Sequence, residues 1–328
     1  METPKTTQLH DLESSIDFYE ARYEQGYMED YPAQVKERIF EIIGGLGLPE
    51  QGEALDFGCG NGVLTDVIRR ALPSWKIFGT DLSATAISNA TTRFPECTFI
   101  EKGDARLTQP RFDLIFSNHV IEHVFDVDSV LDQMNGALKP KCFVLHILPC
   151  GNPGSYEYDL CRLRKDGMNS ALGNRFFFED EGHLRRLTTE QLQQSMESRN
   201  LMLKKGFYAN QYHGAIEWLT NADSSVGFLL KLTDMSQAVD RSASFKLLQK
   251  RIFLIGIAIL RLHAEICSRL LNNRIKGRTK TLMAALTLPF YVVTRMIDGR
   301  IRQAAEKEWR RRKFERNGSE MALYFERA

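Results

Sequence analysis

Short apolar runs alternate with helix-like patterns along the first half of the chain. Five runs have the length and composition of β-strands, at 54–57, 75–80, 98–101, 112–117 and 142–148. Behind the first run, apolar residues recur at Val63, Leu64, Val67 and Ile68 with the 3.6-residue period of a helix. This alternation of strand and helix predicts an α/β domain.

The first strand run leads into a glycine-rich turn, Asp56-Phe57-Gly58-Cys59-Gly60-Asn61-Gly62. Glycine has no Cβ and tolerates positive φ, so three alternating glycines let a ligand approach the backbone closely. The helix that follows directs its free N–H groups and positive dipole end toward the same place. The spacing differs from the dinucleotide-binding Gly-x-Gly-x-x-Gly, and the Asp56 carboxylate would repel a pyrophosphate. The turn therefore predicts a site for a cofactor that carries an ammonium group.

Polar residues also follow the next strand runs. Asp81 ends the second run, and Ser83 just behind it is typical of a helix N-cap. The segment 103–105 (Gly-Asp-Ala) follows the third run, and 118–123 (Asn-His-Val-Ile-Glu-His) follows the fourth. Open α/β sheets bind ligands in the crevice beyond the carboxyl ends of their strands. We therefore expect these segments to face one crevice together with the glycine turn.

These segments, in this order over residues 50–150, resemble the motifs of class I S-adenosylmethionine-dependent methyltransferases. The resemblance implies a transferase whose cofactor is S-adenosylmethionine. It places the methionine end in the glycine turn, both ribose hydroxyls on Asp81, and the adenine amino group at Asp104 and Ala105. The positions that it assigns to cofactor binding are Asp56, Gly58, Cys59, Gly60, Asn61, Gly62, Asp81, Leu82, Asp104, Ala105, Asn118 and His119.

The same resemblance implies the fold class, an α/β, doubly wound, seven-stranded Rossmann-like methyltransferase sheet. We expect its sixth strand at 201–208, behind a helix that Thr188 and Gln191 open as a capping box. Its antiparallel seventh strand is expected at the C-terminal end, and the basic chain between the two strands forms a helical insertion. The expected regions are an N-terminal helical lid (1–40), a cofactor-binding core (41–212) with an acceptor-side loop (150–187), the helical insertion (213–316) and a closing strand (317–328).

The catalytic candidates are histidines. Methyl transfer needs an aligned acceptor and, for a hydroxyl acceptor, a group that takes its proton. Histidine can do so near neutral pH, which makes His119, His123 and His183 the candidate bases. His183 begins the string His-Leu-Arg-Arg-Leu-Thr, which resembles one common in this family; a structural role for His123 and His183 stays open. The candidate acceptor-binding residues are Tyr27, His146, Tyr156, Tyr158, Arg175 and Arg185.

The histidine-rich mouth favours methylation of a hydroxyl or carboxyl oxygen of a small molecule, such as a sugar, a phenol or a lipid-linked intermediate. Methylation of a nitrogen in an amine or a peptide is the alternative within the class. Outside the class, the alternatives are a catalytically degenerate scaffold of the same fold and a nicotinamide oxidoreductase. The intact glycine turn and Asp81 argue against the first, and the glycine spacing argues against the second.

The segment His119-x-x-Glu122-His123 also has the spacing of a zinc-binding motif, but here it follows a strand instead of lying in a helix. Ubiquinone-biosynthesis O-methyltransferases resemble this segment and carry Glu-x-x-Glu-His there, with a metal ion proposed to bind it. Because His119 replaces the first glutamate in this chain, we expect no metal.

Four tyrosines near the N-terminus, Tyr19, Tyr23, Tyr27 and Tyr31, recur every fourth residue. Side chains at this spacing share one face of a helix. In related enzymes such a segment forms a lid over the cofactor, which is the role we expect here. Ordinary packing against the domain is the alternative.

Charge is divided unevenly along the chain. Residues 1–240 hold 23 Lys and Arg against 35 Asp and Glu, whereas residues 241–316 hold 19 against 5. Within the basic part, the apolar runs 252–260 and 282–293 are shorter than the roughly 20 residues that span a bilayer. Apolar runs among cations are typical of helices that lie on an anionic membrane surface. Packing of the runs on each other, on the acidic domain or in a homodimer stays open. Nucleic acid is not an expected partner, because no aromatic residues alternate with these cations.

The composition places the chain among ordinary globular proteins. With 43% hydrophobic and 26% charged residues, its 328 residues suit one large or two small domains. Six cysteines without Cys-x-x-Cys spacing argue against a disulfide framework and a structural zinc site. The N-terminus lacks the apolar core of a signal peptide. We therefore expect a cytoplasmic protein, either free or peripheral at the inner face of the membrane.

Overall fold

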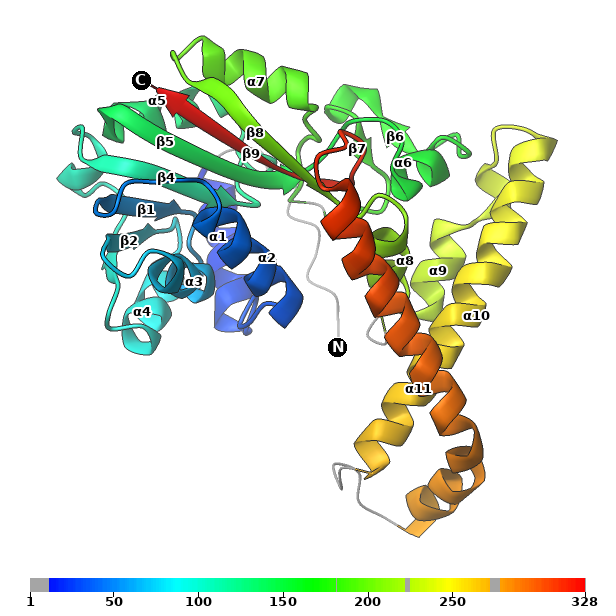
Figure 1. Ribbon diagram of the computed structural model, residues 1–328. Coiled ribbons are helices and arrows are strands. Elements are labelled where there is room, and N and C mark those ends of the chain that lie inside the picture. The colour runs from blue at the N-terminus through cyan, green and yellow to red at the C-terminus, as the bar shows by residue number, and fades with distance from the viewer. Residues whose placement is uncertain (1–11, 181, 222–224, 272–277, 328) are drawn as a thin grey trace.

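A computed structural model describes residues 12–180, 182–221, 225–271 and 278–327 (Figure 1). The strands of its central sheet are β1 (Glu53–Phe57), β2 (Lys76–Thr80), β3 (Thr98–Ile100), β4 (Phe112–Asn118), β5 (Leu138–Pro149), β8 (Met202–Ala209) and β9 (Glu320–Arg327). Their spatial order is β3-β2-β1-β4-β5-β9-β8, and β9 runs antiparallel to both of its neighbours. The predicted fold class, a doubly wound seven-stranded sheet, is confirmed.

The helices connect the strands and cover both faces of the sheet. They are α1 (Leu12–Glu24), α2 (Ala33–Gly44), α3 (Val63–Ala71), α4 (Ala84–Arg93), α5 (Val127–Ala137), α6 (Tyr156–Cys161), α7 (Thr189–Glu197), α8 (His213–Leu219), α9 (Val226–Leu232), α10 (Arg241–Leu271) and α11 (Arg278–Arg312). A separate two-stranded hairpin, β6 (Met168–Asn169) and β7 (Arg175–Phe176), lies in the loop after β5. The sequence did not predict this hairpin, because two-residue strands leave no hydrophobic pattern.

Two predicted helix starts are confirmed in atomic detail. The Ser83 hydroxyl accepts a hydrogen bond from the backbone N–H of Ala86, which caps α4. Thr188 and Gln191 form both hydrogen bonds of the capping box at the start of α7. Such caps satisfy N–H groups that have no partner inside the helix. They fix where each helix leaves the sheet, and α4 starts directly behind Asp81.

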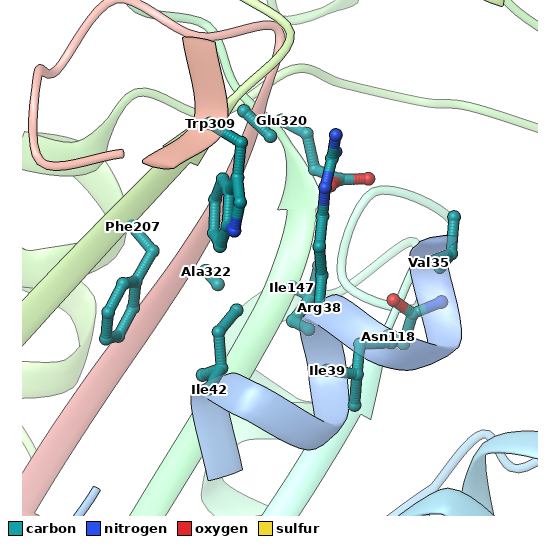
Figure 2. Close-up of a pocket in the computed structure, with 11 residues that line it drawn as sticks. Val35, Arg38, Ile39, Ile42, Asn118, Ile147, Phe207, Trp309, Glu320 and Ala322 are labelled. Carbon is teal, nitrogen blue, oxygen red and sulfur yellow. The ribbon is translucent and has the colours of Figure 1, made fainter. Parts of the chain in front are cut away.

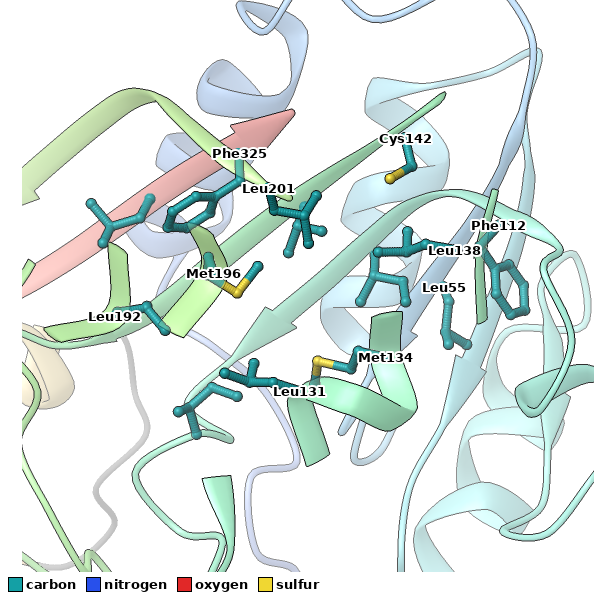
Figure 3. Close-up of a cluster of buried hydrophobic side chains, with 14 of the residues drawn as sticks. Leu55, Phe112, Leu131, Met134, Leu138, Cys142, Leu192, Met196, Leu201 and Phe325 are labelled. Atoms are coloured by element: carbon teal, nitrogen blue, oxygen red, sulfur yellow. The ribbon is translucent and has the colours of Figure 1, made fainter. Parts of the chain in front are cut away.

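Side chains that alternate along β4 build a core on each face of the sheet. Ile115 packs into the cluster that α5 and α7 cover with Leu131 and Met196 (Figure 3). Leu114 and Phe116 point to the opposite face, where they pack under α2 and α3. Because β4 is buried on both faces, it lies rigidly in the middle of the sheet. The residues that follow it, 118–123, are therefore held in a fixed position at the sheet edge.

The prediction that four tyrosines share one face of a helix is wrong for Tyr27 and Tyr31. Helix α1 ends at Glu24, Gly26 then takes the left-handed conformation with φ 83°, and Pro32 stands at the N-cap of α2. A glycine in this conformation commonly ends a helix. Tyr27 and Tyr31 therefore lie in the connection between α1 and α2 and share no helical face with the two tyrosines of α1.

The chain between β8 and β9 forms the four helices α8 to α11, which extend away from the sheet (Figure 1). Arg261 of α10, whose side chain is almost fully buried, binds Asp298 of α11 at 2.9 Å. Near the C-terminal end of α11, Trp309 is buried against the sheet. The neighbouring Glu308 carboxylate accepts a hydrogen bond from the backbone N–H of His213. The long helices are thus anchored to the sheet as well as to each other. None of the described helices combines the length and the apolar composition that crossing a membrane requires.

Candidate cofactor and acceptor site

The glycine turn lies between the carboxyl ends of β1 and β2. Gly58, Gly60 and Gly62 have φ values of 79°, 50° and 77°, which favour glycine. The N–H groups of Gly58 and Cys59 donate to the Thr80 carbonyl at 2.8 and 3.0 Å, so the turn is tied to the end of β2. A Cβ at Gly58 would lie 2.4 Å from a methyl group of Val120. The turn therefore has room for a backbone but not for side chains.

Asp81 lies beside this turn at the end of β2. Its carboxylate accepts hydrogen bonds from the N–H groups of Gly60, at 2.9 Å, and Ser83, at 3.0 Å. Burial raises the pKa of Asp81, and the backbone N–H groups oppose this rise. A carboxylate held at the edge of a glycine turn can accept the hydrogen bonds that the two hydroxyls of a ribose donate. This position fits the predicted role of Asp81.

Asp56 lies beneath the turn and is buried. The Thr65 hydroxyl of α3 donates to its carboxylate at 2.6 Å. Burial raises the pKa of Asp56 to about 7, although the Thr65 hydrogen bond opposes the rise. Asp56 therefore joins β1 to the first turn of α3 and supports the glycine turn from below.

The remaining predicted cofactor positions lie around the same strand ends. Asn61 is buried and donates through Nδ2 to the Tyr27 carbonyl at 2.9 Å. Asp104 follows β3, accepts from the N–H of Arg106 at 2.8 Å and binds its guanidinium at 2.6 Å, which lowers the pKa of Asp104 to about 2. Leu82 and Ala105 are exposed at this rim, whereas Cys59 is buried. The structure thus gathers them along the ends of β1, β2 and β3.

The two tyrosines of α1, Tyr19 and Tyr23, lie over the crevice. The Tyr23 hydroxyl lies so close to Gly60 that a Cβ there would be 2.7 Å from it. The Tyr19 hydroxyl lies 2.9 Å from Nδ1 of His123. Burial is the main reason why the pKa values of both phenols are raised. Helix α1 thus touches the cofactor side and the histidine side of the crevice at once.

His119 follows β4 directly and lies between two carboxylates. Its Nδ1 is 2.8 Å from Oε1 of Glu122, and its Nε2 is 3.4 Å from Oε2 of Glu320. Burial alone would lower the pKa of His119, but the two glutamates outweigh burial and raise the pKa to about 10. Burial would likewise raise the pKa of Glu122, yet His119 holds it at about 2. At neutral pH His119 is therefore a cation that cannot accept a proton, which weakens its prediction as the base.

His123 has the opposite character. Its Nδ1 lies 2.9 Å from the carbonyl oxygen of Gly182. A carbonyl only accepts hydrogen bonds, so this contact assigns the proton to Nδ1 and a lone pair to Nε2. Burial lowers the pKa of His123, and its ring packs edge-on against His183 with 4.6 Å between the ring centroids. The site thus keeps His123 neutral, with one nitrogen able to accept a proton.

His183 is held by a carboxylate from its own loop. Its Nδ1 lies 3.4 Å from Oε1 of Glu179, and the same oxygen accepts from the Arg186 guanidinium at 2.6 Å. His119, Glu122 and His183 each offer a ligand atom within 4.8 Å of the others, so among the described residues they form a group that could hold a metal ion. The expectation of no metal stays a prediction.

A small cavity lies beside α2, next to Asn118 and Glu320 (Figure 2). It measures about 30 Å³ and is lined by Arg38, Asn118, Trp309 and Glu320, among others. Asn118, a predicted cofactor residue and the last residue of β4, thus lines this cavity. The cavity also brings α11, through Trp309, next to the glutamate that binds His119.

Three predicted acceptor-binding residues make contacts that support the fold. His146 is fully buried inside β5, binds the Ser117 hydroxyl at 2.7 Å, and has its pKa lowered by burial to about 4. The Arg185 guanidinium donates to backbone carbonyls of the 121–125 segment. Tyr156 is buried under the Lys250 ammonium group. Because His146 is fully buried within the sheet, its predicted role is corrected, whereas acceptor binding by Arg185 and Tyr156 stays a prediction.

Of the other three acceptor-binding predictions, Tyr27 lies under the Arg22 guanidinium, 3.9 Å from the ring centroid, and Tyr158 and Arg175 make contacts within their own loop. Tyr158 is half-buried against the Phe176 ring, and Arg175 donates to the His183 carbonyl at 3.0 Å. Two site residues were missed, Glu320 and Glu179. Only the tertiary fold brings Glu320 next to His119, which lies 201 residues away in the chain, so no local pattern could have indicated it.

Comparison with known proteins agrees with this geometry. A family model described as a methyltransferase domain matches residues 25–204, which is more than half of the chain. The chain therefore belongs to the methyltransferase domain family. The matched domain is that of a methyltransferase, and the predicted enzyme class and its cofactor, S-adenosylmethionine, are confirmed for this domain.

Two relatives are named trans-aconitate 2-methyltransferase. The protein from Variovorax paradoxus is 31% identical over 103 residues, which cover 30% of this chain and 39% of that one. The protein from Enterobacter is 32% identical over 111 residues, covering 33% and 44%. The matches thus span less than half the length of these relatives.

Among solved structures, the chain is similar to magnesium protoporphyrin IX methyltransferase from Synechocystis, with a TM-score of 0.44, 14% identity and coverage of 62% of this chain and 95% of that one. A methyltransferase from Aquifex aeolicus gives a TM-score of 0.40 at 14% identity, covering 56% and 90%.

Proposed function

We propose that this methyltransferase transfers the methyl group of S-adenosylmethionine to an oxygen atom of a small-molecule acceptor, with His123 as the general base. The observation that carries this proposal is the different surroundings of two histidines only four residues apart. His119 lies between the carboxylates of Glu122 and Glu320, which raise its pKa, whereas Nδ1 of His123 contacts the Gly182 carbonyl and burial lowers its pKa, so that Nε2 is available. Trans-aconitate, after which the two relatives are named, is likewise a small molecule with carboxyl oxygens.

The residues around the glycine turn fit the cofactor. Gly58 and Gly60 would let its methionine end lie on the backbone, Asp56 would support the turn, and Asp81 would accept hydrogen bonds from the ribose hydroxyls. Asp104 and Ala105 would lie at the adenine. When bound, S-adenosylmethionine supplies a methyl carbon that its sulfonium already activates. The chain's own tasks are therefore to orient the acceptor and to remove its proton.

The histidines divide these tasks. Nε2 of His123 takes the proton of an acceptor hydroxyl, and the Gly182 carbonyl holds the ring in the tautomer that makes this possible. The imidazolium of His119 stabilises negative charge that develops on the acceptor oxygen. His183 packs against the His123 ring and fixes its orientation. The Tyr19 hydroxyl closes the crevice from the N-terminal side.

An acceptor screen tests the proposal. Purified protein is incubated with S-adenosylmethionine and a panel of carboxylic acids, phenols, sugars, lipid-linked alcohols and amines, and release of the demethylated cofactor is followed. We expect turnover with an oxygen acceptor. Turnover with amines alone would establish nitrogen methylation instead. Cofactor binding without turnover on any acceptor class would favour a catalytically degenerate scaffold.

A further inference from the structure

Helix α10 carries a continuous apolar face that no described part of the chain covers. Six large side chains on it have between 37% and 67% of their surface exposed, and they are Phe245, Leu248, Ile252, Ile259, Leu262 and Ile266. Their spacings are three, four or seven residues, so they share one side of the helix. Phe253 and Leu260, also exposed, widen this side beyond the narrow seam of a coiled coil. We call these eight residues the apolar face of α10.

Helix α11 continues this character. Leu288, Val292 and Met296 follow one another every fourth residue and are 43%, 64% and 54% exposed. Single exposed apolar residues are ordinary on protein surfaces, but clusters of this extent mark contact with another partner.

The apolar face is exposed although α10 is firmly attached to the rest of the molecule. The opposite side of α10 is fully buried through Leu247, Leu254 and Arg261. The Arg261 guanidinium binds Asp298 of α11 at 2.9 Å and Glu217 of α8 at 2.8 Å. Because a buried ion pair with two partners fixes the rotation of the helix, the same apolar residues always face outward.

Charge decides between the possible partners. The chain from 241 to 316 holds nineteen basic residues and only five acidic ones. Lys246 and Arg300 are exposed on the two helices. A second copy of the chain would bring this basic segment against itself, with few carboxylates to pair with it. Anionic lipid headgroups supply the missing negative charge, and the lipid interior accepts the apolar side chains.

The arrangement of the molecule suits a flat partner. Figure 1 shows α10 and α11 extending beyond the edge of the sheet at which β5 ends, which is the edge that carries the crevice. No described helix could cross a bilayer, so these helices would lie along a membrane surface. We propose that the exposed sides of α10 and α11 dock this methyltransferase on an anionic membrane surface. Docking would place the crevice close to lipid headgroups.

The test is co-sedimentation of the full-length chain with vesicles. Vesicles of phosphatidylcholine with phosphatidylglycerol are compared with phosphatidylcholine alone, at low and at high salt. We expect binding to the anionic vesicles only, and weaker binding at high salt. The double variant Ile252→Glu/Ile259→Glu should bind at least about tenfold more weakly, because it places two carboxylates on the apolar face. The matched control Phe40→Glu changes an apolar residue that is 44% exposed on α2, away from this face, and should bind like wild type.

Three outcomes would overturn the proposal. Wild-type protein could stay in the supernatant with anionic vesicles, or the double variant could sediment as well as wild type. Alternatively, light scattering could show a dimer that the double variant separates into monomers, which would assign the apolar face to a second copy. S-adenosylmethionine binding by the double variant, measured by calorimetry, reports that the core is folded. Vesicle binding and methyl transfer are separate readouts, so failure of one is distinguishable from failure of the other.

Discussion

The glycine turn and the histidine cluster lie side by side in one crevice, yet they are built in different ways. The turn is made within one stretch of chain, from Asp56 to Gly62, and its main outside support is the end of β2. The cluster is assembled from distant segments, because His119 meets Glu320 of the last strand and His123 meets Tyr19 of the first helix. The glycine turn, which we call the binding half of the crevice, is therefore encoded locally. The histidine cluster, which we call the reacting half, depends on the whole fold.

The largest expected effect concerns the reacting half alone. His123→Ala removes the neutral imidazole and should lower kcat by about 100-fold to 10,000-fold, the usual range for loss of a general base. Steady-state turnover on the acceptor found by screening measures it. His213→Ala, at an exposed histidine outside the crevice, is the control and should leave kcat unchanged. A His123→Ala enzyme with wild-type kcat would remove His123 from the mechanism.

A smaller effect is expected for the binding half. Asp81→Ala should weaken S-adenosylmethionine binding by about 100-fold or more, since it removes two hydrogen bonds to a charged group and each contributes about 1.5–3 kcal/mol. Calorimetric titration gives the affinity, and Asp17→Ala, at an exposed carboxylate of α1, serves as the control. Unchanged affinity would contradict the assignment of the ribose to Asp81.

The His119 ion pair should also be visible in the stability of the protein. The folded pKa of His119 is about 10, above its ordinary value of 6.5. Its contribution to the free energy of unfolding is therefore fully present below pH 6.5 and is lost as the pH rises toward 10. Urea unfolding at pH 6 and pH 9.5 should show this decline in wild type and a smaller decline in His119→Gln. Equal declines in both proteins would mean that His119 is not held as a cation.

The smallest expected effect is that of metal removal. Treatment with a chelator, followed by desalting, should leave turnover unchanged, because the proton on His119 already balances the charge of Glu122. Turnover is measured before and after treatment and again after addition of Zn²⁺ or Mn²⁺. A loss that a divalent ion restores would show that His119, Glu122 and His183 bind a metal.

The sequence could predict what local chemistry determines. Strand runs, the glycine turn, the Ser83 cap and the capping box of Thr188 were readable because each depends on neighbours in the chain. It could not show that the His146 side chain is fully buried, since this depends on the place of β5 in the middle of the sheet, between β4 and β9. The tyrosine spacing misled for a related reason, because Gly26 interrupts the helix that a repeat of four predicts.

The charge states of the histidines lay beyond prediction for a physical reason. His119 and His123 occupy one short motif and would have the same pKa as isolated side chains. Burial lowers the pKa of both histidines, and their difference comes from Glu122 and Glu320, which together outweigh burial at His119, whereas burial outweighs Glu122 at His123. Burial and the contact with Glu320 arise only after β9 and the loop around Gly182 pack around the end of β4.

The most direct test of the central claim is calorimetric titration of S-adenosylmethionine into Gly58→Ala and His123→Ala. A Cβ at Gly58 would collide with Val120 at a positive φ, whereas Gly47→Ala has a similar φ of 77° with open space and serves as the control. If the two halves are built separately, Gly58→Ala loses cofactor binding while His123→Ala and Gly47→Ala keep it. Loss of binding in His123→Ala, or wild-type binding by Gly58→Ala, would contradict the account.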